Sequence, residues 1–293
     1  MSSWGIDIGG TKVAVRVETD TSEPYEDAMT WSGSGDVRED LAVLRAAVAS
    51  ARDAAGAPHR VGIAFPAALD AAGRVTSWPN RPHWTGLDWG AVLDELFPGV
   101  AARTADDGDL AALAEAERAG SPDVLYFGVG TGVGGGVVLG GRPVPGPERG
   151  SCELGHAIAD PAGPRCVCGR RGCLQAVASG PAVLRAAGRL RGADTDFDEL
   201  RRAWLDGQEW AAVAVESGCA ALASVAVSTA ELLHPELVLI GGGFAAGLPG
   251  FADVVARHVT GLARPGHRVP RVRQARLGGL SSLHGAVLLG RQD

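Results

Sequence analysis

The sequence predicts an α/β protein made of two similar domains that face a cleft. The chain has 293 residues, which is enough for two compact domains with separate hydrophobic cores. A strand, a glycine-rich turn and a second strand follow one another twice, at residues 7–12 and 130–136, and amphipathic helical segments lie between them. One supersecondary unit that recurs in both halves of a chain indicates two related domains.

Composition excludes several classes of function. Apolar residues make up 46% and charged residues 21% of the chain, as in ordinary globular proteins. The net charge of -7 leaves no basic surplus to displace counterions from phosphates, so we expect no nucleic-acid partner. No apolar run approaches the length of a bilayer span, so we expect no membrane partner. A thiolate metal motif without a signal peptide favours the cytoplasm.

The first glycine turn has the residues of a phosphate site. It reads Asp7-Ile-Gly-Gly-Thr-Lys12, and the alternating residues that follow predict a strand. A carboxylate precedes the turn and a hydroxyl follows it. The backbone N–H groups and Thr11 can therefore hold phosphate oxygens while Asp7 faces a metal ion. A plain structural hairpin is the alternative, because Gly-Gly alone would suffice for one.

The next segments predict a covering helix, a buried strand and a rigid loop. Residues 37–55 place apolar side chains at helical spacing, namely Leu41, Leu44, Val48 and Ala51. Residues 60–65 form a buried strand that ends at Pro66. Asn80 lies between two prolines in a rigid, non-helical segment, where turn formation and ligand binding explain it equally well.

Two adjacent carboxylates mark a candidate acid–base site. Asp106 and Asp107 stand where a loop enters a predicted helix that continues to Glu115. Acidic residues at a helix N-terminus cap it and suit its dipole, so capping is the alternative role. One cap would suffice, however, and two neighbouring carboxylates raise each other's pKa, as is typical of acid–base sites.

A second glycine hairpin and a triple-glycine turn follow. Apolar strand residues flank Gly130-Thr131-Gly132, which predicts two strands whose turn approaches phosphates rather than a flexible linker, since linkers are polar. A buried strand from Glu236 breaks at Gly241-Gly242-Gly243, where a nucleobase or ribose can lie against the backbone. Helical patterns run through residues 184–204 and 210–233, and residues 277–289 predict a closing helix.

One histidine and three cysteines predict a structural zinc site. These four ligands, the usual complement of a closed tetrahedral site, are His156, Cys166, Cys168 and Cys173. Gly169 and Gly172 allow the tight turn between the second and third thiolates. Unrelated thiols beside a surface histidine are the alternative. Zinc would fix His156 together with Glu153 and Gln175 in an arrangement that suits hydrogen bonds to a polyol.

Taken together, these motifs resemble the ROK family (repressor, open reading frame, kinase) over essentially the whole chain. The two glycine turns, the Glu-Leu-Gly-His segment, the Cys-x-Cys-Gly-x-x-Gly-Cys cluster and the triple glycine occur in the family's order and at its separations. The resemblance implies the two-domain fold of the actin, hexokinase and Hsp70 superfamily. It also implies transfer of the γ-phosphoryl group of ATP to the 6-hydroxyl of a sugar, with Mg²⁺.

The resemblance also implies how the chain is divided. The first domain would comprise residues 1–118, joined by the closing helix at about 277–293, and the second would comprise residues 119–276 with the zinc loop. Repressors of the family carry a helix-turn-helix ahead of the first phosphate motif. That motif begins at residue 5 here, so we do not expect a repressor. Kinases of the family are often dimers or tetramers, so we expect a homodimer or homotetramer.

Each motif acquires a role through the resemblance. Asp107 matches the catalytic base, and Asp7 matches the residue that holds Mg²⁺ through water. Sugar contacts match Asn80, Asp106, Glu153, His156 and Gln175. Nucleotide contacts match Gly9, Gly10, Thr11, Lys12, Gly130, Thr131, Gly132, Gly241, Gly242 and Gly243.

Three sugar-contacting positions depart from the family pattern. Asp106 replaces the usual Asn, Gln175 the usual Glu, and Ala67 the usual Gly. The phosphate and zinc motifs are intact. We therefore infer that the machinery of phosphoryl transfer is retained and that the sugar pocket is altered.

Asp106 indicates which sugar is preferred. The Asn at this position of the family contacts the 3- and 4-hydroxyls of a glucose-type sugar. A carboxylate can only accept hydrogen bonds and adds charge beside Asp107, whereas an ammonium group on the sugar supplies donors and a positive charge. We therefore predict that the substrate is kanosamine, 3-amino-3-deoxyglucose. Alternatively, Asp106 is only a helix cap and the substrate is glucose or another common hexose.

A catalytically idle sugar-binding sensor is the alternative of another class. Asp7, Asp107 and both glycine hairpins favour the kinase, because a sensor gains nothing from phosphate hairpins. The donor is a further open point, since some relatives use polyphosphate instead of ATP.

Overall fold

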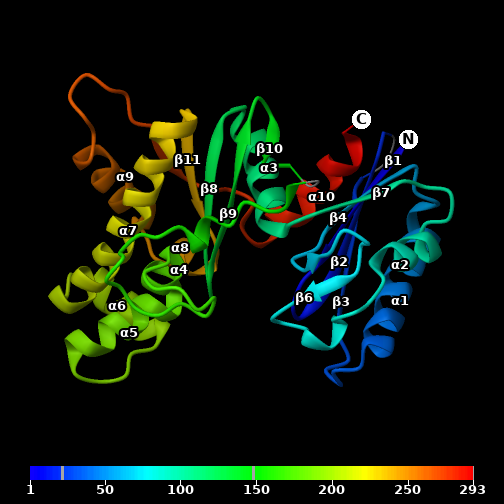
Figure 1. Ribbon diagram of the computed structural model, residues 1–293, viewed down its shortest axis with the longest axis horizontal. Coiled ribbons are helices and arrows are strands. Elements are labelled where there is room, and N and C mark those ends of the chain that lie inside the picture. Colours follow the sequence, from blue (N-terminus) through cyan, green and yellow to red (C-terminus); the bar gives the residue numbers. More distant parts are fainter. Residues whose placement is uncertain (21–22, 147–148, 293) are drawn as a thin grey trace. The chain divides into compact units, whose positions relative to one another are not determined.

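The structure is a computed structural model that describes residues 1–20, 23–146 and 149–292 (Figure 1). The chain divides into two compact units. The first unit comprises Met1–Ala114, Gly146–Ser151 and Leu280–Asp293, and the second comprises Glu115–Pro145 and Cys152–Gly279. The boundaries expected at residues 118 and 276 lie a few residues from these.

The first unit is built on a five-stranded sheet with the order β3-β2-β1-β4-β7. Its strands are β1 (Ser2–Ile8), β2 (Lys12–Thr19), β3 (Tyr25–Thr30), β4 (Arg60–Ala64) and β7 (Ala102–Ala105). The first three strands pair antiparallel, whereas β4 pairs parallel with both β1 and β7. The carboxyl ends of β1, β4 and β7 therefore meet at one edge of the sheet.

Helices and a small hairpin complete the first unit. These elements are α1 (Val37–Ala55), β5 (Ala68–Leu69), β6 (Val75–Ser77), η1 (Pro82–Trp84), α2 (Trp89–Leu96) and α10 (Ser281–Arg291). The helix α3 (Asp107–Ala119) begins in this unit and ends in the second. The predicted bounds of α1 are confirmed: Asp36 caps its start by accepting from Arg38 N, and Gly56 ends it with a φ of 78°.

The closing helix α10 packs against β1 and β4 at backbone distance. A Cβ added to Gly62 would lie 2.0 Å from the carbonyl oxygen of Ala286, and one added to Gly5 would lie 2.7 Å from that of Leu283. Only glycine permits this approach. The predicted helix is confirmed, but it begins later than expected, at Ser281, after the 3-10 turn η4 (Gly278–Leu280).

The second unit repeats the same sheet topology with the order β10-β9-β8-β11-β12. Its strands are β8 (Val124–Val129), β9 (Val133–Leu139), β10 (Arg142–Val144), β11 (Leu237–Gly241) and β12 (Arg271–Gln274). Again the first three strands pair antiparallel and the last two pair parallel. The prediction of two similar α/β units is thus confirmed. The second hairpin turns at Gly130-Thr131-Gly132, as predicted, and the glycines Gly134 to Gly136 that follow it lie within β9.

Helices complete the second unit. They are η3 (Leu154–His156), α4 (Leu174–Ala178), α5 (Gly180–Arg191), α6 (Phe197–Leu205), α7 (Glu209–Leu233), α8 (Gly243–Gly247) and α9 (Phe251–Gly261). The predicted helical patterns correspond to α5, α6 and α7. The triple-glycine turn is shorter than expected, because Gly243 already begins α8.

The expectation that no apolar run approaches the length of a bilayer span is wrong for α7. Its 25 residues are long and apolar enough to cross a membrane by length and composition alone. Half of the apolar window is nevertheless buried inside the protein, and Val215, Cys219 and Leu222 of this helix belong to the core of the second unit. A buried core helix is apolar for the same reason as a membrane span, because neither faces water.

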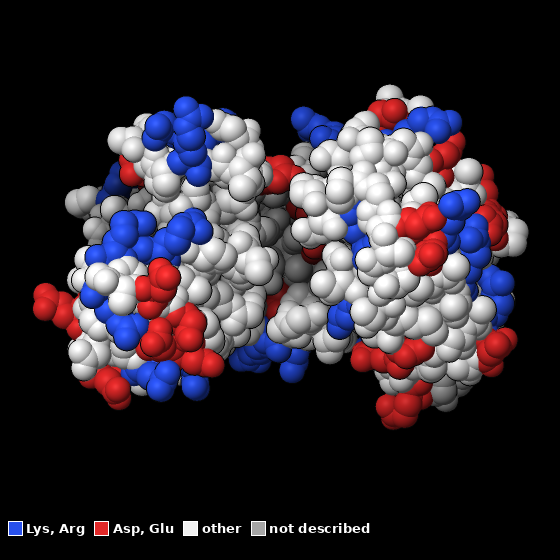
Figure 2. Space-filling view, turned by 90° about the horizontal axis from the view of Figure 1, so that it is seen from below, with Lys and Arg blue, Asp and Glu red and all other residues white. Residues whose placement is uncertain are grey.

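Charged side chains are interspersed on the surface. Acidic and basic residues alternate over both units on the face shown in Figure 2. This agrees with the near balance of 27 basic and 34 acidic residues in the chain.

The tight packing of α10 gives a first prediction. Gly62→Ala should lower the free energy of unfolding by about 3 kcal/mol, because the added methyl group must displace the helix backbone. Gly261→Ala is the matched control, since a Cβ at this exposed end of α9 meets nothing within 4 Å. Urea denaturation followed by tryptophan fluorescence measures both. Equal stability of the two variants would contradict the close approach.

Candidate active site

The carboxyl edge of the first sheet brings the predicted carboxylates together. Asp7 lies near the end of β1, opposite Ala64 of β4, and Ala64 in turn pairs with Ala105, the last residue of β7. Asp106 and Asp107 follow directly. Because these strands run parallel, Asp7 and the Asp106–Asp107 pair leave the sheet at the same edge.

Asp7 is held by a residue that sequence reasoning missed. Ser282 of the closing helix donates from Oγ to Asp7 Oδ2 over 2.7 Å. Burial raises the pKa of Asp7, and the Ser282 hydrogen bond and the charge of Lys12 offset this only in part. Because burial disfavours the charged form of this carboxylate, a cation bound beside it would stabilise its anionic form.

The first glycine turn is a tight hairpin, as predicted. Gly9 N donates to Lys12 O over 2.9 Å, and Thr11 at the tip is exposed. Asn80 lies directly against this turn: a Cβ on Gly10 would sit only 3.0 Å from Asn80 Nδ2. The structure thus joins the candidate sugar residue Asn80 to the candidate phosphate turn, although the two are far apart in sequence.

Asp106 and Asp107 occupy the start of α3. Asp106 Oδ1 accepts from Gly108 N over 2.9 Å, and Asp106 O accepts from Leu110 N over 3.0 Å. The capping role is therefore real for Asp106, while Asp107 is the first helical residue. Asn caps helices about as well as Asp, so capping does not explain why this position carries a negative charge.

In the second unit the predicted nucleotide residues also come together. Gly130 N donates to Gly132 O over 2.9 Å, which closes the second hairpin. Gly242 has a φ of 85°, and a Cβ there would lie 2.4 Å from the backbone N and O of Val129. The triple glycine therefore lies against the strand that leads into the hairpin. The roles of all these residues toward ATP stay predictions.

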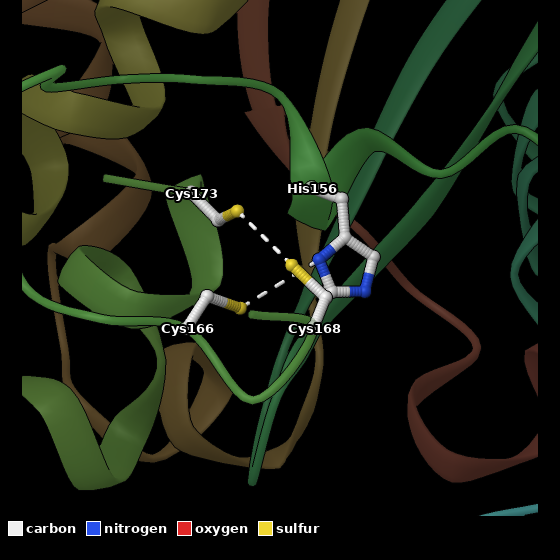
Figure 3. A group of neighbouring side chains, drawn as sticks. All are labelled: His156, Cys166, Cys168 and Cys173. Carbon is white, nitrogen blue, oxygen red and sulfur yellow. Dashed lines mark hydrogen bonds between the residues drawn. The ribbon is translucent and has the colours of Figure 1, made fainter. Parts of the chain in front are cut away.

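The four candidate zinc ligands converge (Figure 3). Their donor atoms all lie within 4.8 Å of one another. Cys166 Sγ is 3.7 Å from His156 Nδ1, and Cys168 Sγ is 3.5 Å from Cys173 Sγ. Sulfurs at about 2.3 Å from a tetrahedral zinc ion are separated by about 3.8 Å, so the donor set fits this metal.

The loop around these ligands needs its glycines. Gly169 and Gly172 have φ values of 89° and 69°, as predicted from the tight turn. A Cβ on Gly172 would lie 1.5 Å from Asp160 O. A hydrogen bond from the backbone of Arg170 and then one from its side chain lower the pKa of Cys168 to about 6. Thiolate, the form that metals bind, is thereby favoured at this ligand.

The candidate sugar residues of the second unit surround the cluster. A Cβ on Gly155 would lie 1.8 Å from Val133 O, so η3 rests on the start of β9 beside the hairpin. The second ring nitrogen of His156 points away from the sulfurs (Figure 3). Gln175 Nε2 donates to Cys166 Sγ over 3.3 Å, and Gln175 Oε1 lies against Gly132. Glu153 immediately precedes η3 and is exposed.

Sequence reasoning also missed a buried polar cluster beneath the first turn. Its members are Trp31, Asp40, Arg81, His83 and Trp84. One signal could have revealed it. Asp40 falls on the apolar face of α1, one turn before Leu44, and a carboxylate on such a face requires buried partners.

Known proteins resemble this chain over most of its length. The sequence profile of the ROK family matches residues 3–293. A kanosamine kinase of Amycolatopsis mediterranei (strain S699) is 52% identical over 286 residues, covering 97% of this chain and 94% of the relative. A glucokinase of Thermotoga maritima is 30% identical over 267 residues, covering 82% of this chain and 81% of the relative.

A solved structure agrees in fold. The crystal structure of a ROK hexokinase from Thermus thermophilus superposes with a TM-score of 0.87 at 31% identity, covering 99% of this chain and 98% of that one. Each of these three relatives is a sugar kinase by name. Because the profile spans nearly the entire chain and these relatives match over most of their length, this protein belongs to the ROK family and has its two-domain, actin-like fold.

Proposed function

We propose that this protein transfers the γ-phosphoryl group of ATP to the 6-hydroxyl of kanosamine. The observation that carries the proposal is the 52% identity to a kanosamine kinase over 97% of the chain. Asp106 supports it independently, because a carboxylate at this position suits an ammonium group better than a hydroxyl. The products are ADP and kanosamine 6-phosphate.

Asp107 acts as the base in the proposed reaction. Its carboxylate accepts the proton of the 6-hydroxyl as that oxygen attacks the γ-phosphorus in line and the bond to the ADP oxygen breaks. Mg²⁺, when bound, neutralises the charge on the phosphates. Asp7 would hold the ion through water, and the half-buried position of this carboxylate suits that role.

The backbone of both glycine hairpins holds phosphate oxygens in this proposal. Thr11 and Thr131 are exposed at the tips of the two turns, where their hydroxyls add further hydrogen bonds. The triple glycine beside the second hairpin supports the adenosine. These contacts fix the donor, so positioning and electrostatic stabilisation supply most of the rate enhancement.

Zinc serves structure rather than chemistry in this proposal. His156, Cys166, Cys168 and Cys173 supply four ligands and leave no open coordination position. The metal fixes the loop that carries Glu153 and His156, which contact the sugar. Thiolate ligands and the use of ATP suit a cytoplasmic enzyme, which stays a prediction, as does a homodimer or homotetramer.

Glucose is the second candidate substrate, and one observation favours it. A glucokinase is among the relatives, at 30% identity. Asp106 caps α3, but an Asn would do so about as well, so the cap does not decide between the two sugars. The two candidates differ only in the charge that the sugar presents to Asp106. A catalytically idle sensor has less support, because both phosphate hairpins and Asp107 are intact.

The substrate is tested with Asp106→Asn. Asn preserves the cap but removes the charge, so the preference for kanosamine over glucose, about ten- to a hundredfold in kcat/KM, should shift back toward glucose. Asp123→Asn is the control, because Asp123 accepts from Gly140 N over 2.8 Å in a similar way outside the site. Values of kcat/KM on glucose, glucosamine and kanosamine decide between the two candidate substrates. Equal or better turnover of glucose by the wild type would end the amino-sugar proposal.

The base is tested with Asp107→Asn. The phosphoryl-transfer rate should fall by roughly two to four powers of ten while sugar affinity stays nearly intact, since only proton acceptance is lost. A coupled ADP-release assay and calorimetric sugar binding measure the two quantities. If Asp106→Asn inactivated the enzyme and Asp107→Asn had a mild effect, the roles of the two residues would be wrongly assigned.

The metal is tested by elemental analysis, which should find about one zinc per chain. Cys168→Ser should lose both zinc and sugar affinity, because the loop that carries Glu153 is no longer fixed. Cys219→Ala is the control and should retain both, since Cys219 lies in the core outside the cluster. Full activity of a metal-free protein would refute the zinc site.

A further inference from the structure

A buried carboxylate anchors the cluster beneath the first glycine turn. Asp40 is fully buried, and its Oδ2 accepts from Trp84 Nε1 over 2.8 Å, from His83 Nε2 over 2.7 Å and from Arg81 Nη1. Burial alone would raise the pKa of Asp40, but the bonds from Trp84 and His83 and the charge of Arg81 outweigh it, and the pKa is lowered. Asp40 is therefore a carboxylate at neutral pH that fixes Arg81.

Arg81 connects this anchor to the turn. The residue is 7% exposed, and its Nε donates to Gly10 O over 3.2 Å. The guanidinium carbon lies 4.8 Å from the centre of the Trp31 ring. One planar group thus meets a carboxylate, a backbone carbonyl and an aromatic face at once, which a lysine ammonium cannot do.

Trp31 holds the same turn from a second direction. Its indole Nε1 donates to Gly9 O over 2.8 Å, and its backbone N donates to Thr11 O over 3.2 Å. Together with Arg81, these bonds engage the carbonyl groups of three consecutive turn residues. The cluster therefore fixes the carbonyl side of the turn, while Gly9 N closes the turn on Lys12 O.

The cluster also fixes Asn80. This residue immediately precedes Arg81, and its side chain lies against Gly10, where a Cβ would come within 3.0 Å of Asn80 Nδ2. The Gly10 peptide is therefore held by the side chains of two neighbouring residues, Asn80 and Arg81. Arg81 and Asn80 are adjacent in sequence and both contact Gly10 of the turn.

We propose that Arg81, anchored by Asp40 and covered by Trp31, is a positioning residue that fixes the phosphate-binding turn relative to the sugar-binding Asn80. This inference rests on the proposed kinase function and deepens it. Arg81 touches neither ATP nor sugar in the proposal. It acts through Gly10 and Asn80, so that the phosphates of ATP and the sugar hydroxyl are aligned for in-line transfer.

A purely structural role predicts a different result. A buried ion pair that only stabilises the first unit would lower the melting temperature when altered and leave the turnover of the folded enzyme unchanged. Positioning instead affects the step in which donor and acceptor must align. Misplacement by about 1 Å far from the reacting atoms can cost a hundredfold in rate. The separation of kcat from KM therefore distinguishes the two roles.

The test uses Arg81→Lys and the milder Trp31→Phe. Arg81→Lys should lower kcat about ten- to a hundredfold, and Trp31→Phe about three- to tenfold, while the KM for the sugar changes less than about threefold. Trp204→Phe is the matched control, because Trp204 Nε1 also donates to a backbone carbonyl, Pro249 O, over 2.9 Å, but in the second unit. Assays use full-length zinc-loaded enzyme and the sugar that the wild type phosphorylates fastest.

A second measurement does not depend on turnover. Calorimetry gives the sugar affinity with and without a non-hydrolysable ATP analogue. The ratio of the two affinities, with nucleotide over without, should fall toward one in Arg81→Lys. If the wild type phosphorylated no sugar, the proposed function would fail and this coupling alone would decide the role of Arg81. Unchanged kcat and coupling in both variants, or an equal loss in Trp204→Phe, would overturn the inference.

Discussion

Parallel pairing of β4 with β1 and with β7 is the constraint on which the rest of the first unit depends. It places the ends of three strands at one edge, so that Asp7 and the Asp106–Asp107 pair leave the sheet on the same side. A small residue of the same sheet positions the closing helix. Gly62 on β4 lets this helix approach at backbone distance, and Ser282 of the helix donates to Asp7.

The second unit uses the same topology for a different purpose. Its antiparallel hairpin and its triple glycine meet at the end of β8, where Gly242 lies against Val129. The zinc loop, which carries the four candidate ligands from His156 to Cys173, packs against the same hairpin, since Gly155 lies against Val133 and Gln175 against Gly132. A metal that holds this loop therefore also bears on the second hairpin, which joins the candidate sugar and nucleotide residues of this unit.

Two pairs of charged side chains in the first unit differ in how their charges are balanced. Asp40 and Arg81 form a buried ion pair, in which desolvation of both charges opposes their mutual attraction, so removing either partner alone would leave an uncompensated buried charge. Asp106 and Asp107, by contrast, place two carboxylates side by side at one helix start. The helix dipole stabilises this arrangement in part, and a cationic substrate or metal would stabilise it further.

Sequence alone determined what depends on local chemistry. Helical periodicity located α1, glycine content located both hairpins, and the spacing of one histidine and three cysteines located the metal cluster, because each signal lies within one short segment. Only the tertiary structure decided which distant residues meet. Ser282 on Asp7, Asn80 on Gly10 and Arg81 between Asp40 and the turn are such contacts. They depend on how helices pack on a sheet, and the apolar character of α7 was misread for the same reason: a sequence does not show whether an apolar face meets a protein core or a membrane.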